Sequence, residues 1–210
     1  MLEPAVGTGR IIIPLLQAGM TVDGVDSSPE MLAVCRANCA AAGLDPVLHE
    51  ADMRRFVDPG RYAAVILPAG SIMLLEGREA TAEALACFHR CLETGGRLIL
   101  DLDPPTVGTD PGPMRHWASG DDILTLQVQH VEHDPVANRT TRWLRYERWR
   151  DGALVATQLQ LFGLQRWSLD EFAGMLVDAG FGEISICGDY GLGLSPQPSS
   201  WVWTFQATAR

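Results

Sequence analysis

The sequence contains no lysine: its 16 basic residues are all arginines. This absence excludes mechanisms that depend on a Schiff-base lysine or on the lysine of a P-loop. No apolar run approaches the roughly 18 residues that span a bilayer, so we expect no transmembrane helix. The five cysteines are an odd number, and no signal-peptide pattern opens the chain. Both features favour a reducing compartment, and we expect a cytoplasmic protein.

The chain is also poor in positive charge overall, with a formal net charge of −10 and a pI of about 4.8. An acidic protein is a poor match for nucleic acid or an anionic membrane. One stretch departs from this composition, because five arginines alternate with aromatic residues over 139–150. They are Arg139, Arg142, Arg145, Arg148 and Arg150, with Trp143, Tyr146 and Trp149. Their spacing along a strand distributes the charges over both faces, which favours a subunit interface or an anionic acceptor over nucleic acid.

Short apolar runs alternate with helix-period segments as far as Leu102. The runs at 22–25, 47–50, 62–67 and 97–102 are typical of buried parallel strands. Helices are predicted over 11–18, 27–42 and 79–93. Ser27 and Glu30 have capping-box spacing at the start of the second helix. This order predicts an α/β fold with a doubly wound, mostly parallel sheet.

The pattern changes after Leu102. A loop rich in proline and glycine is predicted over 104–113, followed by strands near 122–131, 138–150 and 153–164. No helix separates these strands, so we expect an antiparallel β insertion. A helix over 168–179 and strands near 182–188 and 200–208 close the chain. We therefore predict a core over 1–118, an insertion over 119–165 that serves as acceptor lid or dimer contact, and a C-terminal part of the core over 166–210.

A glycine-rich turn at the start of the chain carries the clearest functional signal. Gly7 and Gly9 leave no side chain between the backbone and a ligand, and a predicted helix follows at once. Asp26 ends the next strand, where a carboxylate accepts hydrogen bonds from ribose hydroxyls. A dinucleotide site would require a third glycine where this chain has Ile12, so a nucleoside without a pyrophosphate fits better.

In these residues the chain resembles the class I S-adenosylmethionine-dependent methyltransferases. The resemblance implies a Rossmann-like, seven-stranded sheet in the order 3-2-1-4-5-7-6 with the last strand antiparallel. It implies S-adenosylmethionine as cofactor, with S-adenosylhomocysteine as product. The family's acidic and glycine motif matches Glu3, Ala5, Gly7 and Gly9, with alanine in place of the first glycine.

The same resemblance assigns the other cofactor contacts. Asp26 matches the ribose-binding acid, within a stretch that also contains Ser27 and Met31. Met31 falls on the predicted core stripe of its helix, so packing is an equal alternative to contact with adenine. Asp52 and Met53 match the pair that contacts adenine. Leu67 matches the residue whose carbonyl receives the methionine amino group.

The antiparallel insertion is similar to that of methyltransferases acting on sugars and natural products, so we predict a small-molecule acceptor. Family members carry a segment before the glycine motif, whereas only Met1 and Leu2 precede Glu3 here. We therefore expect a longer natural chain, or a lid from another subunit. A homodimer is compatible with the exposed edges of the inserted sheet.

Methyl transfer needs alignment more than a fixed catalytic triad. His116 and Tyr190 are the candidates for moving a proton. No metal site is predicted: the cysteine pairs 35/39 and 87/91 are spaced as buried helix positions rather than as zinc ligands. A non-catalytic nucleoside-binding subunit and an NAD-linked oxidoreductase remain as alternatives.

Overall fold

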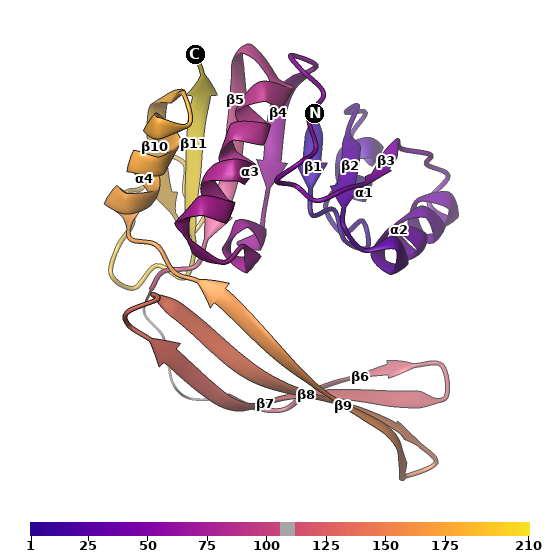
Figure 1. Cartoon of the computed structure of the whole chain (residues 1–210). Helices are drawn as coiled ribbons and strands as arrows, with labels where there is room; N and C mark the ends of the chain where they lie inside the picture. The colour runs from indigo at the N-terminus through magenta and orange to yellow at the C-terminus, as the bar shows by residue number, and fades with distance from the viewer. Residues whose placement is uncertain (106–111) are drawn as a thin grey trace. The chain divides into compact units, whose positions relative to one another are not determined.

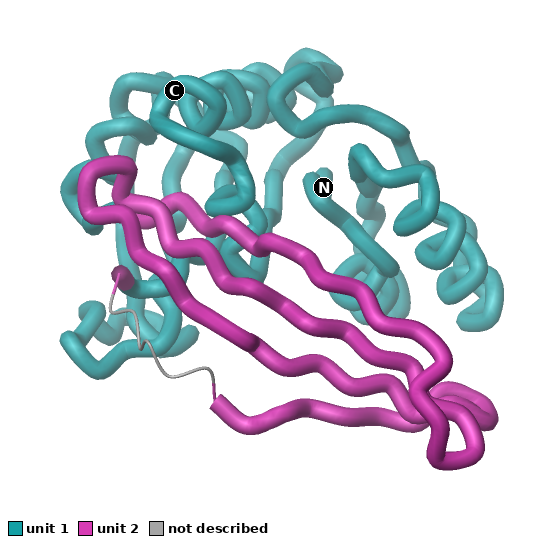
Figure 2. The backbone as a smooth tube through the Cα atoms, turned by 60° about the horizontal axis from the view of Figure 1, so that its bottom comes forward, with its two compact units in different colours: residues 1–104, 167–210 teal, residues 105–166 magenta. Residues whose placement is uncertain are grey.

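The computed structural model describes residues 1–105 and 112–210, and the chain divides into two compact units (Figure 2). Unit 1 comprises 1–104 and 167–210, and unit 2 comprises 105–166. The second unit begins earlier than the predicted boundary at 118/119, because a strand at 115–119 that the sequence analysis missed pairs with the inserted sheet. Of the predicted loop over 104–113, residues 106–111 lie outside the described residues.

Unit 1 is built on a seven-stranded sheet with the order β10-β11-β5-β4-β1-β2-β3 (Figure 1). The first five strands in the chain are parallel, and β11 is antiparallel to both of its neighbours. This confirms the predicted order, with β11 as the reversed seventh strand. The strands are β1 (Leu2–Pro4), β2 (Asp23–Asp26), β3 (Leu48–Glu50), β4 (Tyr62–Leu67), β5 (Leu92–Leu102), β10 (Phe181–Gly188) and β11 (Trp203–Ala209).

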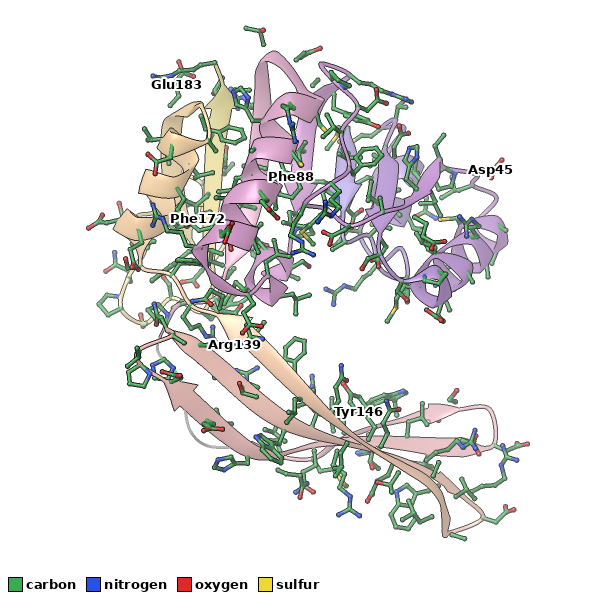
Figure 3. The ribbon with its side chains drawn as sticks, viewed as in Figure 1. Asp45, Phe88, Arg139, Tyr146, Phe172 and Glu183 are labelled. Carbon is green, nitrogen blue, oxygen red and sulfur yellow. The ribbon has the colours of Figure 1, made fainter. Side chains whose placement is uncertain are left out.

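Four α-helices and one 3₁₀ turn accompany this sheet. They are α1 (Ile12–Gln17), α2 (Pro29–Ala41), η1 (Ser71–Leu74), α3 (Gly77–Cys91) and α4 (Leu169–Asp178). Helices α3 and α4 lie side by side against the sheet (Figure 1). Their stripe residues Phe88 and Phe172, labelled in Figure 3, are almost fully buried, and Phe172 packs edge-on against Phe205 of β11. Apolar burial at helical spacing therefore holds these helices on the sheet.

The helix N-termini test the capping predictions. Ser168 caps α4 in a capping box with Glu171, at the residue where the predicted helix begins. At α2 the prediction was one residue early: the N-cap is Ser28, whose Oγ accepts the Met31 N–H at 3.1 Å. Ser27 is displaced from the cap because Asp26 takes the Ser28 N–H at 2.9 Å and holds the preceding turn. No described helix has both the length and the apolarity to cross a bilayer.

All five cysteines are buried with free thiols, which agrees with the packing interpretation of the two helical pairs. The Cys87 Sγ donates to the carbonyl oxygen of Arg54 at 2.8 Å and so links α3 to the segment after β3. Within the described ranges, no three histidine, cysteine or acidic side chains gather as metal ligands would.

Unit 2 is a four-stranded antiparallel sheet with the order β6-β7-β8-β9. Its strands are β6 (Arg115–Ser119), β7 (Asp122–Asp134), β8 (Arg139–Arg150) and β9 (Ala153–Gln165). The tight turn between β8 and β9 places Asp151 and Gly152 at φ of 49° and 77°, as expected for this dipeptide in a hairpin. Strand β9 pairs only with β8 in the described structure and is therefore an edge strand.

Adjacent serines at the start of α2 provide a matched test of the capping assignment. Ser28→Ala removes the acceptor for the Met31 N–H, and we expect it to lower the free energy of unfolding by about 1 kcal/mol. Ser27→Ala removes an exposed side chain outside the cap, and we expect a change close to zero. Urea denaturation of the two variants measures both changes. A larger decrease in the free energy of unfolding for Ser27→Ala would identify Ser27 as the N-cap instead.

Candidate functional site

A cavity of about 320 Å³ opens at the carboxyl ends of β1 and β4 in unit 1. Its lining comes from the end of β1 and the turn after it, from the turn after β4 with the first residue of η1, and from one residue of α2. The lining residues are Glu3, Ala5, Val6, Gly7, Thr8, Arg10, Ile11, Met31, Pro68, Ala69 and Ser71. A larger hollow of about 510 Å³ lies on the sheet of unit 2, but none of its polar side chains is buried. The cavity lined by Glu3 lies at the carboxyl ends of parallel strands, where open α/β sheets bind ligands, and it includes a buried charged group.

The turn after β1 requires unusual backbone angles. Ala5, Gly7 and Gly9 all have positive φ, at 52°, 56° and 89°. Gly9 has a second constraint, since a Cβ there would lie 2.9 Å from the Sγ of Cys35. Gly9 therefore allows α2 to pack against the turn, whereas Gly7 lines the cavity itself. Ala5, which replaces the first glycine of the family motif, adopts a left-handed conformation that its Cβ disfavours.

The carboxylate of Asp26 connects this turn to the next strand. Its Oδ2 accepts the Gly7 N–H at 2.8 Å, and its Oδ1 accepts the Ser28 N–H at 2.9 Å. A carboxylate has about four acceptor positions, so two remain for ligand hydroxyls. Asp26 thus fixes the backbone beside the cavity and keeps the capacity to bind a ribose.

Two further predicted residues lie near this point. Ser27 is exposed on the turn between β2 and α2. Met31 lines the cavity with 46% of its surface exposed, so the packing alternative for this residue is wrong. Its position on α2 fits contact with a bound ligand instead.

Asp52 and Met53 lie half-buried in the segment after β3, and neither lines the cavity. Arg54, which the sequence analysis did not single out, binds Asp52 through its backbone N–H and its guanidinium, with Nε 3.0 Å from Oδ1. These hydrogen bonds lower the pKa of Asp52 and keep it ionised. An ionised acceptor is the form that would receive an amine donor from adenine.

At the end of β4, the side chain of Leu67 is fully buried, and the chain then turns through Pro68 and Ala69 into the cavity wall. The Ala69 N–H donates to Oδ2 of Asp101 at 3.0 Å. Asp101, on β5, is 3% exposed and also accepts the Thr204 hydroxyl through Oδ1 at 2.7 Å. This buried carboxylate therefore orders the turn that carries the cavity wall.

Tyr190 is connected to the same carboxylate. Its hydroxyl donates to Oδ2 of Asp101 at 2.8 Å, so one acceptor atom joins Tyr190 to the Ala69 backbone of the cavity wall. Partial burial and the hydrogen bond to Asp101 raise the pKa of Tyr190 to about 12. The phenol is therefore protonated at neutral pH. The sequence placed Tyr190 and Asp101 at strand ends, but their 89-residue separation concealed the contact.

Glu3 is the most deeply buried ionisable group in the cavity wall, at 2% exposure. Its Oε2 has no hydrogen-bond partner among the described residues. Burial raises the pKa of Glu3 to about 8, and the positive charge of Arg10 partly opposes this shift. Arg10 lines the same cavity and was not singled out from the sequence. Arg10 directly follows Gly9 of the glycine-rich turn, and this position could have indicated from the sequence that it lies at the site.

The other predicted catalytic residue belongs to unit 2. His116 lies exposed on β6, opposite Thr125 of β7, which in turn is opposite Glu147 of β8. Tyr146, labelled in Figure 3, is the next residue along β8 and so points to the other face of this sheet. The catalytic assignment of His116 stays a prediction.

Comparison with known proteins now identifies the family. Residues 1–96 match the family model described as "Methyltransferase domain". The glycine/sarcosine N-methyltransferase of Aphanothece halophytica is 30% identical over 197 residues, which cover 90% of this chain and 69% of that protein. The chain belongs to the class I S-adenosylmethionine-dependent methyltransferases.

Solved structures share the fold of this chain. A sugar N-methyltransferase from a Streptoalloteichus species superimposes with a TM-score of 0.80 and 23% identity, covering 100% of this chain and 79% of that one. The chain spans about half the length of the first curated relatives it matches. One of these is an uncharacterised protein of Mycobacterium tuberculosis, 33% identical over 148 residues that cover 62% of this chain and 53% of the relative.

The left-handed alanine in the glycine motif leads to a stability prediction. A non-glycine residue in this conformation costs roughly 1–2 kcal/mol, whereas glycine adds about 0.4–1 kcal/mol of unfolded-state entropy. We expect Ala5→Gly to raise the free energy of unfolding by about 0.5–1 kcal/mol. Ala33→Gly, on the exposed face of α2, should lower it by about 1 kcal/mol. Denaturant titration compares the two, and equal losses would contradict the strain at Ala5.

Proposed function

We propose that this methyltransferase transfers a methyl group from S-adenosylmethionine to a small-molecule acceptor. The observation that carries the proposal is the unit 1 cavity, where a carboxylate-fixed glycine turn adjoins a buried carboxyl group and an arginine. A nucleoside joined to a charged amino acid fits this lining. In this proposal Asp26 binds the ribose of the ligand, and Glu3 and Arg10 bind the charged groups of its amino-acid part.

Each residue then has a chemical role in the proposal. Asp26 holds the ribose hydroxyls, and Asp52 with Met53 contacts adenine. The Leu67 carbonyl receives the amino group, and Arg10 pairs with the carboxylate. When bound, S-adenosylmethionine would supply an activated methyl group to an acceptor aligned with its carbon–sulfur bond. The protein contributes mainly alignment and the exclusion of water.

An amine is the acceptor class that we favour. The relatives reported above are named as N-methyltransferases of glycine and sarcosine and of a sugar. An amine attacks through a neutral nitrogen, so its proton has to leave before or during transfer. The acceptor site therefore needs a group that accepts or relays a proton.

Tyr190 and Asp101 form such a pair in our proposal. Because its pKa is raised, Tyr190 stays protonated and cannot act as a simple base at neutral pH. Its oxygen can accept a proton from the amine while its own proton passes to Oδ2 of Asp101, 2.8 Å away. Tyr190 is thus a relay rather than the final acceptor. His116 remains a second candidate for the same task, on unit 2.

The oxidoreductase alternative has little to support it. Ile12 occupies the place of the third glycine of a dinucleotide site, and its side chain is fully buried in the core of unit 1. A close approach of a pyrophosphate would require removing that side chain. A nucleoside-binding subunit without turnover would use the same cavity. Only an activity assay distinguishes this hypothesis from an enzyme.

We further propose that β9 mediates a homodimer. This 13-residue edge strand carries no charged residue, and Leu159 and Leu161 are 72% and 63% exposed. Long uncharged edges pair readily with another strand, and a second copy supplies an identical one. The arginines of β8 are partly neutralised within unit 2, since Arg145 pairs with Glu147 and Arg150 with Asp122. This weakens the case for an anionic partner.

Sedimentation velocity of the wild type and of Leu159→Lys tests the dimer.

A reducing compartment such as the cytoplasm is also part of the proposal. All five thiols are free and buried, and none is positioned in a disulfide. Counting reactive thiols after unfolding without reductant tests it, and fewer than five would contradict it.

The cofactor assignment is tested by calorimetric titration with S-adenosylhomocysteine, with NADH as the comparison ligand. We expect the wild type to bind the first and not the second. Asp26→Ala should weaken binding on the order of 2–4 kcal/mol, because two hydrogen bonds to a charged acceptor are lost. Asp45→Ala, in the exposed loop after α2 (Figure 3), is the matched control and should bind as the wild type. Unchanged binding by Asp26→Ala would remove the ribose assignment.

The proton relay is tested by Tyr190→Phe. We expect kcat to fall on the order of 10²-fold with glycine, sarcosine or an amino sugar as acceptor, while the Kd for S-adenosylhomocysteine is retained. Tyr62→Phe removes a similar tyrosine–aspartate hydrogen bond. Tyr62 begins β4, at the end of that strand away from the cavity, and its hydroxyl donates to Asp23 of β2. That control should lose stability but not kcat. A parallel loss of kcat in both variants would assign Tyr190 a purely structural role.

A further inference from the structure

The turn after β10 places two residues other than glycine in left-handed conformations. The Gly191 N–H donates to the carbonyl oxygen of Gly188 at 2.9 Å, and the residues between them, Asp189 and Tyr190, have φ of 56° and 58°. This pattern is that of a type I′ turn, whose central positions favour glycine, asparagine and aspartate. Among the described residues, no other neighbouring pair without glycine has positive φ at both positions. The bulky side chain of tyrosine makes its conformation a strained one.

The carboxylate of Asp189 ties this turn to the start of β11. The Asp189 N–H donates to the carbonyl oxygen of Val202 at 3.0 Å, and its Oδ1 accepts the Trp201 N–H at 2.8 Å. At the next residue, the Tyr190 hydroxyl donates to Asp101. Strained residues persist only where the surrounding structure imposes their conformation, and they gather at ligand sites. Asp189 therefore fixes the backbone of Tyr190 relative to that of Trp201.

The result of this constraint is a pair of aromatic rings at the surface of unit 1. The rings of Tyr190 and Trp201 lie edge to face, with centroids 5.3 Å apart and an interplanar angle of 73°. The two residues are 54% and 65% exposed, so burial in the core does not account for the strain. A tryptophan held in one orientation offers a large apolar area to a ligand and loses little freedom when it binds.

Hydrogen bonds connect the aromatic pair to the cavity wall. The Ala69 N–H, in the cavity wall, and the Tyr190 hydroxyl donate to the same oxygen of Asp101. Burial and that hydrogen bond raise the pKa of Tyr190 to about 12, and the positive charge of Arg10, in the cavity lining, partly opposes the shift. Trp201 does not line the cavity itself. It is therefore placed for the second substrate rather than for the cofactor.

We propose that Trp201 binds the carbon skeleton of the methyl acceptor while the acceptor nitrogen lies at the Tyr190 hydroxyl, and that Asp189 is the positioning residue for both side chains. This inference rests on the proposed function and narrows its acceptor class. An amine borne on a ring has enough apolar surface to cover the indole, whereas sarcosine has little beyond its polar groups. The aromatic pair therefore selects a ring-bearing amine.

Steady-state kinetics of Trp201→Ala tests the contact with the acceptor. With S-adenosylmethionine at saturation, an amino sugar is compared with sarcosine. We expect the wild type to favour the amino sugar, and Trp201→Ala to raise the KM for it on the order of tenfold with kcat little changed. The KM for sarcosine should stay close to that of the wild type. Val177→Ala, which truncates a 60% exposed apolar side chain on α4, is the matched control and should change neither.

Two substitutions of Asp189 test the positioning role. Asparagine tolerates the left-handed conformation and keeps an oxygen for the Trp201 N–H, whereas alanine lacks both properties. We expect Asp189→Ala to raise KM as Trp201→Ala does and to lower kcat as Tyr190→Phe does. It should also lose the near-ultraviolet circular dichroism of the ring pair, defined as the difference between the wild type and Trp201→Ala. Asp189→Asn should retain all three wild-type properties.

The outcomes separate this inference from the function on which it rests. An unchanged KM for the amino sugar in Trp201→Ala, or a wild type that favours sarcosine, would overturn the inference while the function stands. Wild-type kinetics in Asp189→Ala, or equal defects in Asp189→Asn, would remove the positioning role. If Asp189→Ala does not fold, Trp201→Ala still decides, because it truncates an exposed side chain. Binding of S-adenosylhomocysteine without turnover of any amine would overturn the proposed acceptor and the inference together.

Discussion

The hydrogen bonds of the Asp26 carboxylate are the interaction on which the rest of the site depends. One oxygen holds the Gly7 N–H of the turn after β1, and the other holds the Ser28 N–H at the start of α2. Two segments 19 or more residues apart thereby meet at one strand end. Because the parallel strands end at the same edge, these two hydrogen bonds align the turn with the helix, and they use two of the roughly four acceptor positions of the carboxylate.

Buried carboxyl groups organise the remainder of the cavity, and they differ in how they are satisfied. Asp101 has three hydrogen-bond donors and orders the turn after β4. Glu3 has an oxygen without any. A satisfied buried carboxylate contributes rigidity, whereas an unsatisfied one is held neutral by desolvation. The same cost of burial therefore accompanies an ordered turn at Asp101 and a raised pKa at Glu3.

Unit 2 relies on different forces. Its hairpins are ordered by turn residues and cross-strand pairs, and much of β9 stays exposed. Ion pairs such as Arg150 with Asp122 join its strands at the surface, where each contributes little to stability. The uncharged edge is the feature of this unit that most needs an explanation, and pairing with a second copy is the simplest one.

Local pattern by itself determined most of the fold and the edge of the sheet at which the cavity lies. Alternating apolar runs and capping signals predicted the strands and helices, and the sequence singled out Gly7 and Asp26, which the structure joins by a hydrogen bond. These signals are local because a strand, a cap or a glycine turn depends on neighbouring residues. The strand at 115–119 and the start of α2 at Ser28 were missed, since partner strands and competing hydrogen bonds decide them.

Only the tertiary structure decided the electrostatics of the site. The pairing of Tyr190 with Asp101, the hold of Arg54 on Asp52 and the isolation of Glu3 all depend on which groups burial brings together. A sequence specifies which groups can ionise, but the solvent and partners around each one set its charge. Those surroundings exist only once distant segments have packed, and for that reason the chemistry of Glu3 could not be predicted from its motif.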